Sequence, residues 1–399
     1  MRILLLNQTF YPDVVATGQY MAMVAEELVR RGHEVTVVTG RRAYDQPETV
    51  FANNEIWRGV RIHRVLSTRF GKGAKWRRAL DFGSFIASCF FRIVRLPRHD
   101  LVVALTTPPL ISFIGACTSI LWRCRFCYWV MDFNPDEAIA AGWLRAGSLV
   151  ARILDRISRF SLNRADRIIA LDRFMRDRIA GKGIPLEKIA VIPPWAYEDE
   201  IRFDPDGREE FRRLLGIGDE FVVMYSGNHS PVHPLDTLIE AARRLRDEKE
   251  ILFCFVGGGS EFRKVKEIAE AEKLSRVLCR PYQPLNKLAG SLSAGDMQVV
   301  VMGDAMLGLV HPCKIYNILG VSSPVLYIGP VPSHVTEIAD EAPDSLFFMA
   351  RHGEPERVAG LIMEAFRSRG NISRSVRLPV SCAREDLLQQ FIAVLESGG

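Results

Sequence analysis

The sequence lacks a hydrophobic stretch long enough to cross a membrane. Its longest apolar run, residues 109–122, ends before Arg123, short of the ~20 residues that a spanning helix needs. The opening residues, Met-Arg-Ile-Leu-Leu-Leu-Asn, are apolar over only a few positions, so we expect a strand there and no signal peptide. Internal repeats and low-complexity tracts are also missing. These features predict a cytoplasmic protein that is at most peripheral at the inner face of the cell membrane.

Signatures of several other classes are missing as well. No Gly-x-Gly-x-x-Gly follows the first expected strand, which argues against a dinucleotide-dependent oxidoreductase. Eight cysteines in an intracellular chain predict free thiols, and Cys124-Arg-Phe-Cys127 opens an expected strand rather than a helix, unlike a thioredoxin-type site. His229 and His233 have no cysteine or acidic partner at metal-ligand spacing, so we expect no metal site.

Composition and charge indicate a soluble globular protein with one unusual region. The chain has 399 residues, of which 48% are hydrophobic and 25% are charged, and this length favours two domains. Its net charge of +5 is unevenly distributed, because residues 57–99 carry eleven Lys or Arg and a single acidic residue, Asp81. This local excess of positive charge predicts an anionic partner for the region.

Expected strands and helices alternate along almost the whole chain. The strands, such as residues 2–7 and 221–226, are short continuous apolar runs, as parallel strands covered on both faces require. A proline-rich, acidic stretch near residue 195 separates two such series. We therefore predict an α/β protein of two doubly wound, Rossmann-like parallel-sheet domains facing across a cleft. Residues 1–195 form the first domain, residues 196–380 the second, and residues 381–399 a C-terminal helix that crosses back to the first.

Two loops of the first domain fall where ligands gather in such sheets, after the carboxyl ends of strands. Residues 8–18 are long for a strand–helix connection, which favours a function. The helix that follows is expected over residues 18–31, with Thr17 as its cap. Asp132 directly follows an apolar strand and is a candidate catalytic group, although the alternative is a turn before a short helix capped by Asp136.

Glycines and polar groups follow the first two strands of the second domain. Gly227 allows a ligand to approach the backbone, and Asn228 and His229 offer polar groups before a helix expected near residue 234. Gly257 and Gly258 precede the next helix, an arrangement that suits phosphate or sugar oxygens. Either loop could instead be an ordinary polar connection.

The segment 309–319 carries the strongest signal in the chain. Pro312 suits the first turn of a helix, which places His311 at its N-terminal end and sets Lys314 and Asn317 one turn apart on one face. A lysine at a helix N-terminus can hold a diphosphate. Because the neighbouring residues are apolar and predicted to be buried, we favour a ligand site over a surface lysine.

The basic region contains an expected amphipathic helix over residues 76–95. Aromatic and aliphatic residues are interleaved there with basic ones, which favours an anionic membrane surface as partner and argues against nucleic acid. The residues expected to face the membrane are Lys72, Lys75, Trp76, Arg77 and Arg78.

Essentially the whole chain resembles the family-4 glycosyltransferases, which have the GT-B fold. The opening Arg2-Ile-Leu-Leu-Leu-Asn, the junction Val191-Ile-Pro-Pro-Trp and the segment Tyr225-Ser-Gly-Asn match the family's pattern. The run His311-Pro-Cys-Lys-Ile-Tyr-Asn is similar to the Pro-Ser-Lys version of the donor segment. That version occurs in the branch that resembles capsule, O-antigen and colanic-acid fucosyltransferases.

This resemblance implies sugar transfer from a UDP- or GDP-linked donor, with retention at the anomeric carbon and without a metal or other cofactor. The donor would bind the second domain, and a glycan acceptor, expected to be polyprenyl-diphosphate-linked, would bind the first. The implied catalytic residues are Asp132, His311 and Lys314. The implied donor-binding residues are Gly227, Asn228, His229, Gly257, Gly258, Tyr282, Gln283, His311, Lys314 and Asn317. The expected acceptor-binding residues are Tyr11, Thr17, Gly18 and Asp136.

The sequence departs from the family's pattern at three places, one of which is Asp132, at the expected position of the family's first-domain His. Leu309 and Asn317 stand where the family usually has Glu-x7-Glu, and Asn228 and His233 stand where it usually has Arg and Lys. More of the diphosphate charge would therefore fall on Lys314 and His311. Two further functions remain as alternatives, namely a nucleotide-sugar 2-epimerase of the same fold and an inactive GT-B subunit that binds a partner transferase.

Overall fold

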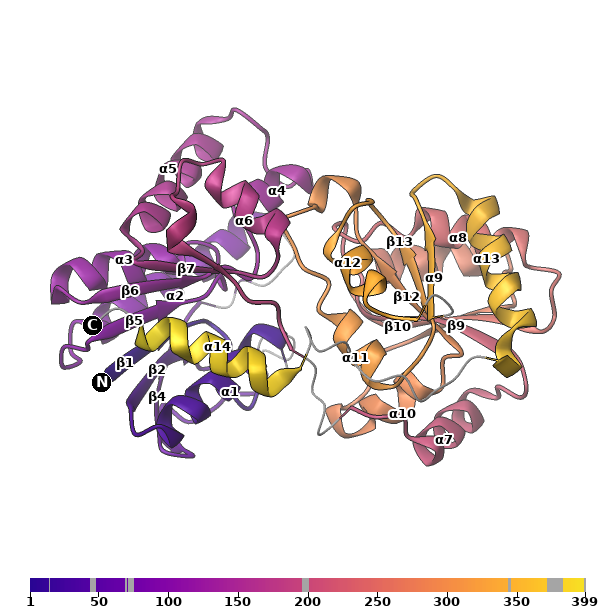
Figure 1. The fold of residues 1–399 in the computed structure, drawn as a ribbon, viewed down its shortest axis with the longest axis horizontal. Coiled ribbons are helices and arrows are strands. Elements are labelled where there is room, and N and C mark those ends of the chain that lie inside the picture. Colours follow the sequence, from indigo (N-terminus) through magenta and orange to yellow (C-terminus); the bar gives the residue numbers. More distant parts are fainter. Residues whose placement is uncertain are drawn as a thin grey trace. The chain divides into compact units, whose positions relative to one another are not determined.

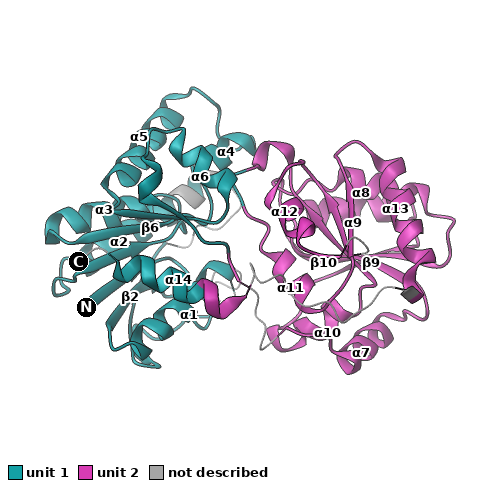
Figure 2. Ribbon diagram, in the orientation of Figure 1, with its two compact units in different colours: residues 1–193, 308–310, 388–399 teal, residues 194–307, 311–387 magenta. Residues whose placement is uncertain are grey.

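The computed structural model divides the chain into two compact units, each with its own sheet (Figures 1 and 2). It describes residues 1–13, 15–43, 48–68, 70, 75–195, 201–343, 346–371 and 383–397. Unit 1 comprises Met1–Pro193, Gly308–Val310 and Leu388–Gly399, and unit 2 comprises Pro194–Leu307 and His311–Leu387.

Unit 1 is built on an eight-stranded sheet in the order β3-β4-β2-β1-β5-β6-β7-β8. Every neighbouring pair is parallel except β3 and β4, which form an antiparallel edge that the sequence did not predict. The strands are β1 Arg2–Leu6, β2 Glu34–Gly40, β3 Asn54–Trp57, β4 Val60–Val65, β5 Leu101–Ala104, β6 Arg125–Trp129, β7 Arg167–Ala170 and β8 Ile189–Val191. The helices are α1 Ala16–Arg30, α2 Lys75–Ile93, α3 Ile111–Trp122, α4 Asp136–Ala140, α5 Leu149–Arg164 and α6 Arg173–Ala180, joined by most of α14, Arg384–Glu396.

Unit 2 carries a six-stranded sheet whose neighbouring strands all run parallel, in the order β11-β10-β9-β12-β13-β14. The strands are β9 Phe221–Asn228, β10 Ile251–Gly258, β11 Val277–Arg280, β12 Met297–Val301, β13 Val325–Ile328 and β14 Phe347–Ala350. The helices are α7 Pro205–Leu215, α8 Asp236–Arg244, α9 Ser260–Ala271, α10 Leu288–Ser293, α11 Lys314–Gly320, α12 His334–Asp340 and α13 Pro355–Arg367. Two Rossmann-like parallel sheets confirm the predicted fold class.

The central strands are buried on both faces because helices cover both sides of each sheet. In unit 2, Phe221, Val223 and Tyr225 of β9 pack into one apolar core with α8, while Val222 and Met224, on the opposite face, pack against α7. Successive residues of a strand point to opposite faces, so a strand buried on both sides must be apolar throughout. This is why continuous apolar runs were a reliable signal for these strands.

The prediction for the start of α1 is wrong. The helix begins at Ala16, so Thr17 lies inside it rather than at its cap. The Thr17 hydroxyl lies 3.0 Å from Thr9 Oγ1, which joins the helix to the loop after β1 instead of satisfying a backbone amide. A Cβ at Gly18 would lie 3.1 Å from the backbone of Phe10, so glycine allows this first turn to pack closely on that loop.

Other local features are clear in the structure. Asp204 caps α7, because its carboxylate accepts a hydrogen bond from the amide of Gly207 at 2.9 Å. The described cysteines are free, and burial raises the pKa of Cys124 to about 11 and that of Cys127 to about 12, so neither is a reactive thiolate. Within the described ranges, no helix combines the length and the hydrophobicity that a membrane span requires.

Candidate functional site

In unit 2 the strand order reverses between β9 and β12, and the loops at this switch point are the expected place for a ligand. Glycines line the carboxyl end of β9 and of its neighbour β10, where Gly227 pairs with Gly257. At Gly257, φ is +140° and a Cβ would lie 2.0 Å from the carbonyl oxygen of Gly227, so only glycine fits there. The two predicted glycine loops therefore form one continuous backbone surface without side chains.

Lys314, the first residue of α11, extends its amine into this edge. Its Nζ lies 3.4 Å from the centroid of the Tyr225 ring, and a Cβ at Gly227 would also lie 3.4 Å from Nζ. Nζ is buried and meets no hydrogen-bond partner among the described residues. Burial without a carboxylate partner lowers the pKa of Lys314 well below its ordinary value. The cation–π contact offsets only part of that desolvation cost.

The two histidines of the loop after β9 face the same lysine. Burial, and then the charge of Lys314, lowers the pKa of His229 and of His233 to about 3. The Nδ1 atom of His229 lies 2.8 Å from the carbonyl oxygen of Gly227, and Nδ1 of His233 lies 2.7 Å from that of Val301. A carbonyl oxygen only accepts, so Nδ1 carries the single proton of each neutral ring. In this tautomer Nε2 of each ring is a hydrogen-bond acceptor.

Four buried polar atoms of this edge share one property, which is that none has a hydrogen-bond partner among the described residues. They are His229 Nε2, Ser230 Oγ, Lys314 Nζ and Asn317 Oδ1. Buried polar groups of folded proteins are nearly always paired, so such a cluster marks a place that a ligand completes. The amine suits an anionic oxygen, whereas the imidazole acceptor requires an O–H or N–H group. The arrangement fits a molecule that carries both phosphates and hydroxyl groups.

The remaining predicted donor residues lie beside these groups, except for Gln283. A Cβ at Gly258 would lie 3.0 Å from the ring of Tyr282, which is half exposed. Asn228 is exposed, while its carbonyl oxygen accepts a hydrogen bond from the Tyr225 hydroxyl at 3.0 Å. Gln283 uses its amide to donate to the carbonyl oxygen of Pro281 at 3.0 Å, so this contact holds the turn after β11.

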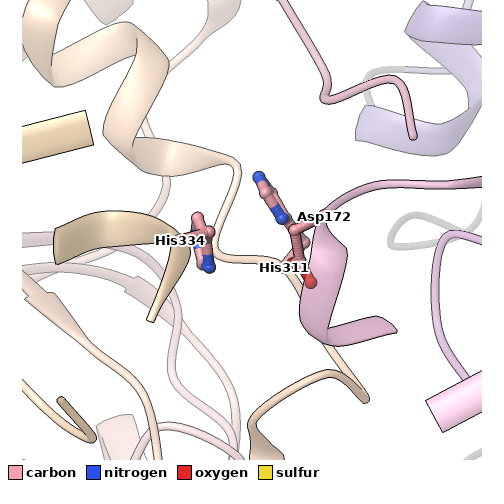
Figure 3. A group of neighbouring side chains, drawn as sticks. All are labelled: Asp172, His311 and His334. Atoms are coloured by element: carbon pink, nitrogen blue, oxygen red, sulfur yellow. The ribbon is translucent and has the colours of Figure 1, made fainter. Parts of the chain in front are cut away.

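His311 precedes α11 and is already engaged within unit 2. Its Nε2 lies 2.7 Å from the hydroxyl of Tyr316, and its ring stacks on that of His334 with 3.8 Å between centroids (Figure 3). The predicted helix start at Pro312 is two residues too early, because α11 begins at Lys314. Asp172, also drawn in Figure 3, belongs to unit 1 and caps α6 by accepting from the Met175 amide at 2.8 Å. The catalytic role implied for His311 stays a prediction.

In unit 1, Asp132 follows β6 and is a buried carboxyl group. Desolvation raises its pKa to about 6. The nearby Asp136 is instead neutralised, because Lys182 Nζ lies 2.6 Å from its carboxylate and 2.6 Å from that of Asp155. Asp136 is the first residue of α4 and not its cap, which is Pro135. The raised pKa of Asp132 makes its carboxyl group a candidate for proton transfer.

The loop after β1 separates into an exposed aromatic residue and a buried polar network. Tyr11 is 43% exposed and stacks on Trp57 with 4.5 Å between ring centroids. Thr17 and Gly18 instead serve packing, since the amide of Asn7 donates to Thr9 and so extends the network around Thr17. Their expected role in acceptor binding stays a prediction.

Sequence reasoning missed two residues that belong to these edges. Tyr225 provides the ring that Lys314 contacts, and it was hidden within an apolar strand. Thr106 follows β5 beside the loop after β1, and its hydroxyl is buried without a partner among the described residues. The detectable signal at Thr106 was a polar residue directly after the apolar strand that neighbours β1.

Two further expectations concern metal ions and the membrane. Taken separately, neither unit gathers three His, Cys, Asp or Glu ligands among its described residues. Of the residues expected to face a membrane, Trp76 and Arg77 are exposed on α2, and the Arg77 guanidinium lies 5.3 Å from the Trp76 ring centroid. Lys72 and the side chains of Lys75 and Arg78 lie outside the described part of the chain.

Solved structures of low sequence identity share this fold. Sucrose-phosphate synthase from Thermosynechococcus elongatus superposes with a TM-score of 0.75 at 14% identity, covering 99% of this chain and 98% of its own. Anabaena Alr3699/HepE, solved with UDP and glucose, gives a TM-score of 0.73 at 16% identity and covers 100% of both chains. The two sheets therefore define a GT-B fold, the class to which glycosyltransferases of this kind belong.

Sequence comparison matches a glycosyl transferase domain to each half of the chain. The glycosyl transferase 4-like domain matches residues 16–195, and the glycosyl transferases group 1 domain matches residues 207–309. An Escherichia coli protein named as colanic acid biosynthesis glycosyl transferase WcaI is 25% identical over 98% of this chain and 99% of its own length. The chain belongs to the family-4 glycosyltransferases, which confirms the predicted family and enzyme class.

Proposed function

We propose that this glycosyltransferase moves a sugar from a UDP- or GDP-linked donor to a polyprenyl-diphosphate-linked glycan during synthesis of a cell-surface polysaccharide. The observation that carries the proposal is the cluster of buried, unpartnered polar atoms around Lys314. A nucleoside-diphosphate sugar supplies the anionic oxygens and the hydroxyl groups that this cluster lacks. The similarity to a protein named for colanic acid biosynthesis, and to a structure solved with UDP and glucose, supports the same class of substrate.

We infer that Lys314 stabilises the departing diphosphate. Negative charge grows on the leaving group in the transition state, and an ammonium in a site of low dielectric opposes it strongly. Gly227 and Gly257 let the phosphates approach the backbone where a side chain would block them. With this charge supplied by a side chain, transfer needs no metal ion. Retention at the anomeric carbon is proposed separately, from the resemblance to the family. His229 accepts a hydrogen bond from a hydroxyl group of the donor.

We assign the acceptor to unit 1, where Asp132 and Tyr11 are the principal contacts. Asp132, whose pKa is about 6, exchanges a proton readily near neutral pH and interacts with the reacting acceptor hydroxyl. The exposed ring of Tyr11 offers an apolar face to a sugar. The lipid part of the acceptor reaches the enzyme at the inner face of the cell membrane, where Trp76 and Arg77 of α2 contact anionic lipid.

The test is nucleoside-diphosphate release by the purified protein across UDP-, GDP- and dTDP-sugars, with and without a lipid extract that contains polyprenyl-linked glycans. We expect release that requires one donor and the extract and persists in EDTA. Epimerisation of a donor in the absence of acceptor would identify the 2-epimerase alternative. Absence of both nucleotide binding and release would favour the inactive-subunit alternative, and release that EDTA abolishes would contradict metal independence.

A further inference from the structure

The loops that follow β1 and β5 lie at the switch point of unit 1. The strand order of this sheet reverses between these two strands, as it does between β9 and β12 in unit 2. Gln8 follows β1 and Thr106 follows β5, and each lies two residues beyond the end of its strand. A ligand of unit 1 is therefore expected beside these two residues.

Two buried atoms at this switch point have no hydrogen-bond partner among the described residues, namely Gln8 Oε1 and Thr106 Oγ1. Thr106 is 5% exposed, so bulk water does not supply the partner that its hydroxyl group lacks. At the same edge, the hydroxyl groups of Thr9 and Thr17 lie 3.0 Å apart and hydrogen-bond to one another. Unpaired buried groups next to paired ones indicate a place that a ligand completes.

The backbone around these two residues is held in place by hydrogen bonds. The Gln8 amide donates to the carbonyl oxygen of Thr107 at 2.6 Å, and the carbonyl oxygen of Gln8 accepts from the amide of Gly40 at 2.9 Å. The side-chain oxygen of Asn7 accepts from the Thr107 amide at 3.2 Å, so the loop after β1 is joined directly to the segment after β5. Gln8 and Thr106 are therefore held in neighbouring segments before a ligand arrives, which limits the entropy cost of binding.

Asp132 occupies the next loop along the same edge. β6 is the other neighbour of β5 in the sheet, and Asp132 follows β6. In strand order, three consecutive loops therefore carry Gln8, Thr106 and Asp132. The Gln8 oxygen accepts from an O–H group, and the Thr106 hydroxyl both donates and accepts. The matching ligand has several neighbouring hydroxyl groups, which is the chemistry of a sugar ring.

We propose that Gln8 and Thr106 determine which acceptor sugar is used, through hydrogen bonds to the hydroxyl groups next to the one that reacts at Asp132. This inference rests on the proposed function in taking the ligand of unit 1 to be the acceptor. A site of this kind discriminates against an analogue that lacks the hydroxyl, because the protein group then stays buried and unpaired. The acceptor is therefore a glycan whose terminal sugar keeps these hydroxyl groups free, and a sugar that is deoxygenated or substituted there binds poorly.

The first test measures acceptor kinetics of the wild type, Thr106→Val and Gln8→Met with the polyprenyl-linked lipid extract. Both substitutions nearly keep the side-chain volume and remove the hydrogen-bonding atom. We expect the apparent KM for the extract to rise about tenfold in each variant, with kcat and the calorimetric affinity for UDP or GDP little changed. The thermal unfolding temperature should hold or rise, because an unpaired buried group is lost. Thr106→Ser keeps the hydroxyl group and should restore most of the acceptor affinity.

The matched control is Thr36→Val on β2. Thr36 is a buried threonine of the same sheet, and its hydroxyl group lies 3.0 Å from His99 Nε2. This variant should lower the unfolding temperature, because the His99 ring loses that partner, and it should keep the wild-type KM. If Thr106→Val behaves like this control, the role of Thr106 is structural and the proposal is overturned.

A second measurement does not depend on turnover. Methyl glycosides of glucose, galactose and mannose, together with their monodeoxy analogues, are titrated into the protein and followed by NMR. We expect the wild type to bind at least one parent sugar and to bind one of its deoxy analogues about tenfold more weakly, whereas Thr106→Val or Gln8→Met should bind the two alike. This pattern without any transfer would contradict the proposed function and support the inference. Transfer with wild-type KM in both variants, or a wild type that neither binds these sugars nor transfers to the extract, would overturn it.

Discussion

The carboxyl edges of the two sheets treat their buried polar groups differently. In unit 1, Asn7, Thr9 and Thr17 hydrogen-bond to one another, and Lys182 neutralises Asp136. The corresponding edge of unit 2 leaves the atoms of the Lys314 cluster, namely His229 Nε2, Ser230 Oγ, Lys314 Nζ and Asn317 Oδ1, without partners among the described residues. Unit 1 therefore pairs several of its polar groups at this edge, although Gln8 Oε1 and Thr106 Oγ1 have no partner among the described residues, and we expect a ligand to complete the cluster in unit 2.

This difference indicates that an anionic ligand would stabilise unit 2 more than unit 1. A buried amine without a counter-ion costs folding free energy, and a protein keeps it when a ligand recovers that cost. In unit 1 the group with an unfavourable charge is Asp132, because desolvation raises its pKa and so disfavours its ionised form. We therefore expect substitutions in unit 2 to act mainly on nucleotide binding, and substitutions in unit 1 to act on stability and on the acceptor step.

The largest effect should come from Lys314→Met. This variant keeps the side-chain volume and removes the amine, so nucleoside-diphosphate affinity should fall on the order of a hundredfold or more while the thermal unfolding temperature holds or rises. Calorimetric titration with UDP and GDP, together with a thermal melt, measures both. Leu285→Ser, at an exposed apolar position of the same unit, is the control and should change neither. Wild-type affinity in the Lys314 variant would place the diphosphate elsewhere.

The pH dependence of nucleotide affinity should be the next largest effect. In the empty site the pKa of Lys314 is lowered, and a bound diphosphate raises it, so above the empty-site pKa binding must take up a proton. Affinity for UDP or GDP should therefore fall with rising pH by up to about tenfold per unit. His229 and His233, with pKa values of about 3, remain neutral throughout this range.

Calorimetry between pH 7 and 9.5 measures this slope, in a range where the phosphates have already ionised, since their second pKa is about 6. Lys314→Arg provides the control, because a guanidinium stays charged and its profile should be flat. For the protein without ligand, stability depends on pH with the opposite sign to that of nucleotide affinity. The unfolded lysine holds a proton that the folded one has released, so the contribution of Lys314 to stability rises with pH between the lowered pKa and about 10.4. A flat wild-type binding profile would show that the buried amine is charged before the ligand arrives.

Asp132→Asn should have the reverse effect of Lys314→Met, because it should change sugar transfer and leave nucleotide affinity unchanged. The folded carboxyl has a raised pKa of about 6, so stability falls as pH rises from about 3.9 through 6, and the wild type carries that cost at pH 7. The amide variant should therefore be more stable at pH 7 by about 1–3 kcal/mol, lose transfer by on the order of a hundredfold, and keep its nucleotide affinity. Asp136→Asn is the control, since breaking the ion pair with Lys182 should destabilise the protein. Equal turnover in Asp132→Asn would remove this carboxyl from the reaction.

The fold was predictable because it depends on patterns that are local in sequence. Parallel strands buried on both faces must be apolar throughout, and helices between them repeat apolar residues at helical spacing, so β1, β6 and β9 could be recognised directly. The short edge strands β3 and β14 carry little such signal, because an edge strand needs less apolar surface. The start of α1 was misplaced because Thr17 bonds to Thr9, a tertiary partner that competes with capping.

The candidate site was predictable in its positions and less so in its chemistry. Loops after strand ends identified Gly227, His229 and Lys314, because sheet topology fixes where such loops gather. The protonation of these groups depends on burial and on partners from distant parts of the chain, which no local pattern contains. The Tyr225 ring beneath Lys314, and the carbonyl oxygen that fixes the His229 tautomer, became visible only in three dimensions.

The smallest expected effect is on the stability of unit 1. It concerns the ion pair between Glu396 of α14 and Arg31, the residue that follows α1. Glu396 of α14 accepts from Arg31 at 2.9 Å and lies 2.9 Å from His33 Nε2. The hydrogen bond with His33, and then the charge of Arg31, lowers the pKa of Glu396, although burial opposes this shift. Because the group is about one-third exposed, solvent screening limits the interaction, and Glu396→Gln should lower the free energy of unfolding by about 0.5 kcal/mol at pH 7.

The sign of the pH dependence identifies this contribution. A carboxylate with a lowered pKa stabilises the fold above its unfolded value, about 4.3, and loses that stabilisation as pH falls through the folded value. The difference in urea midpoint between the wild type and Glu396→Gln should therefore be present at pH 7, shrink below pH 4, and decrease in high salt. Lys264, paired with Asp236 on the surface of unit 2, offers a matched control, because Lys264→Gln should have an effect of similar size. A loss of several kcal/mol in the Glu396 variant would mean that α14 is held by its charges, and not chiefly by the apolar contact between Phe391 and Trp129 at 4.3 Å between ring centroids.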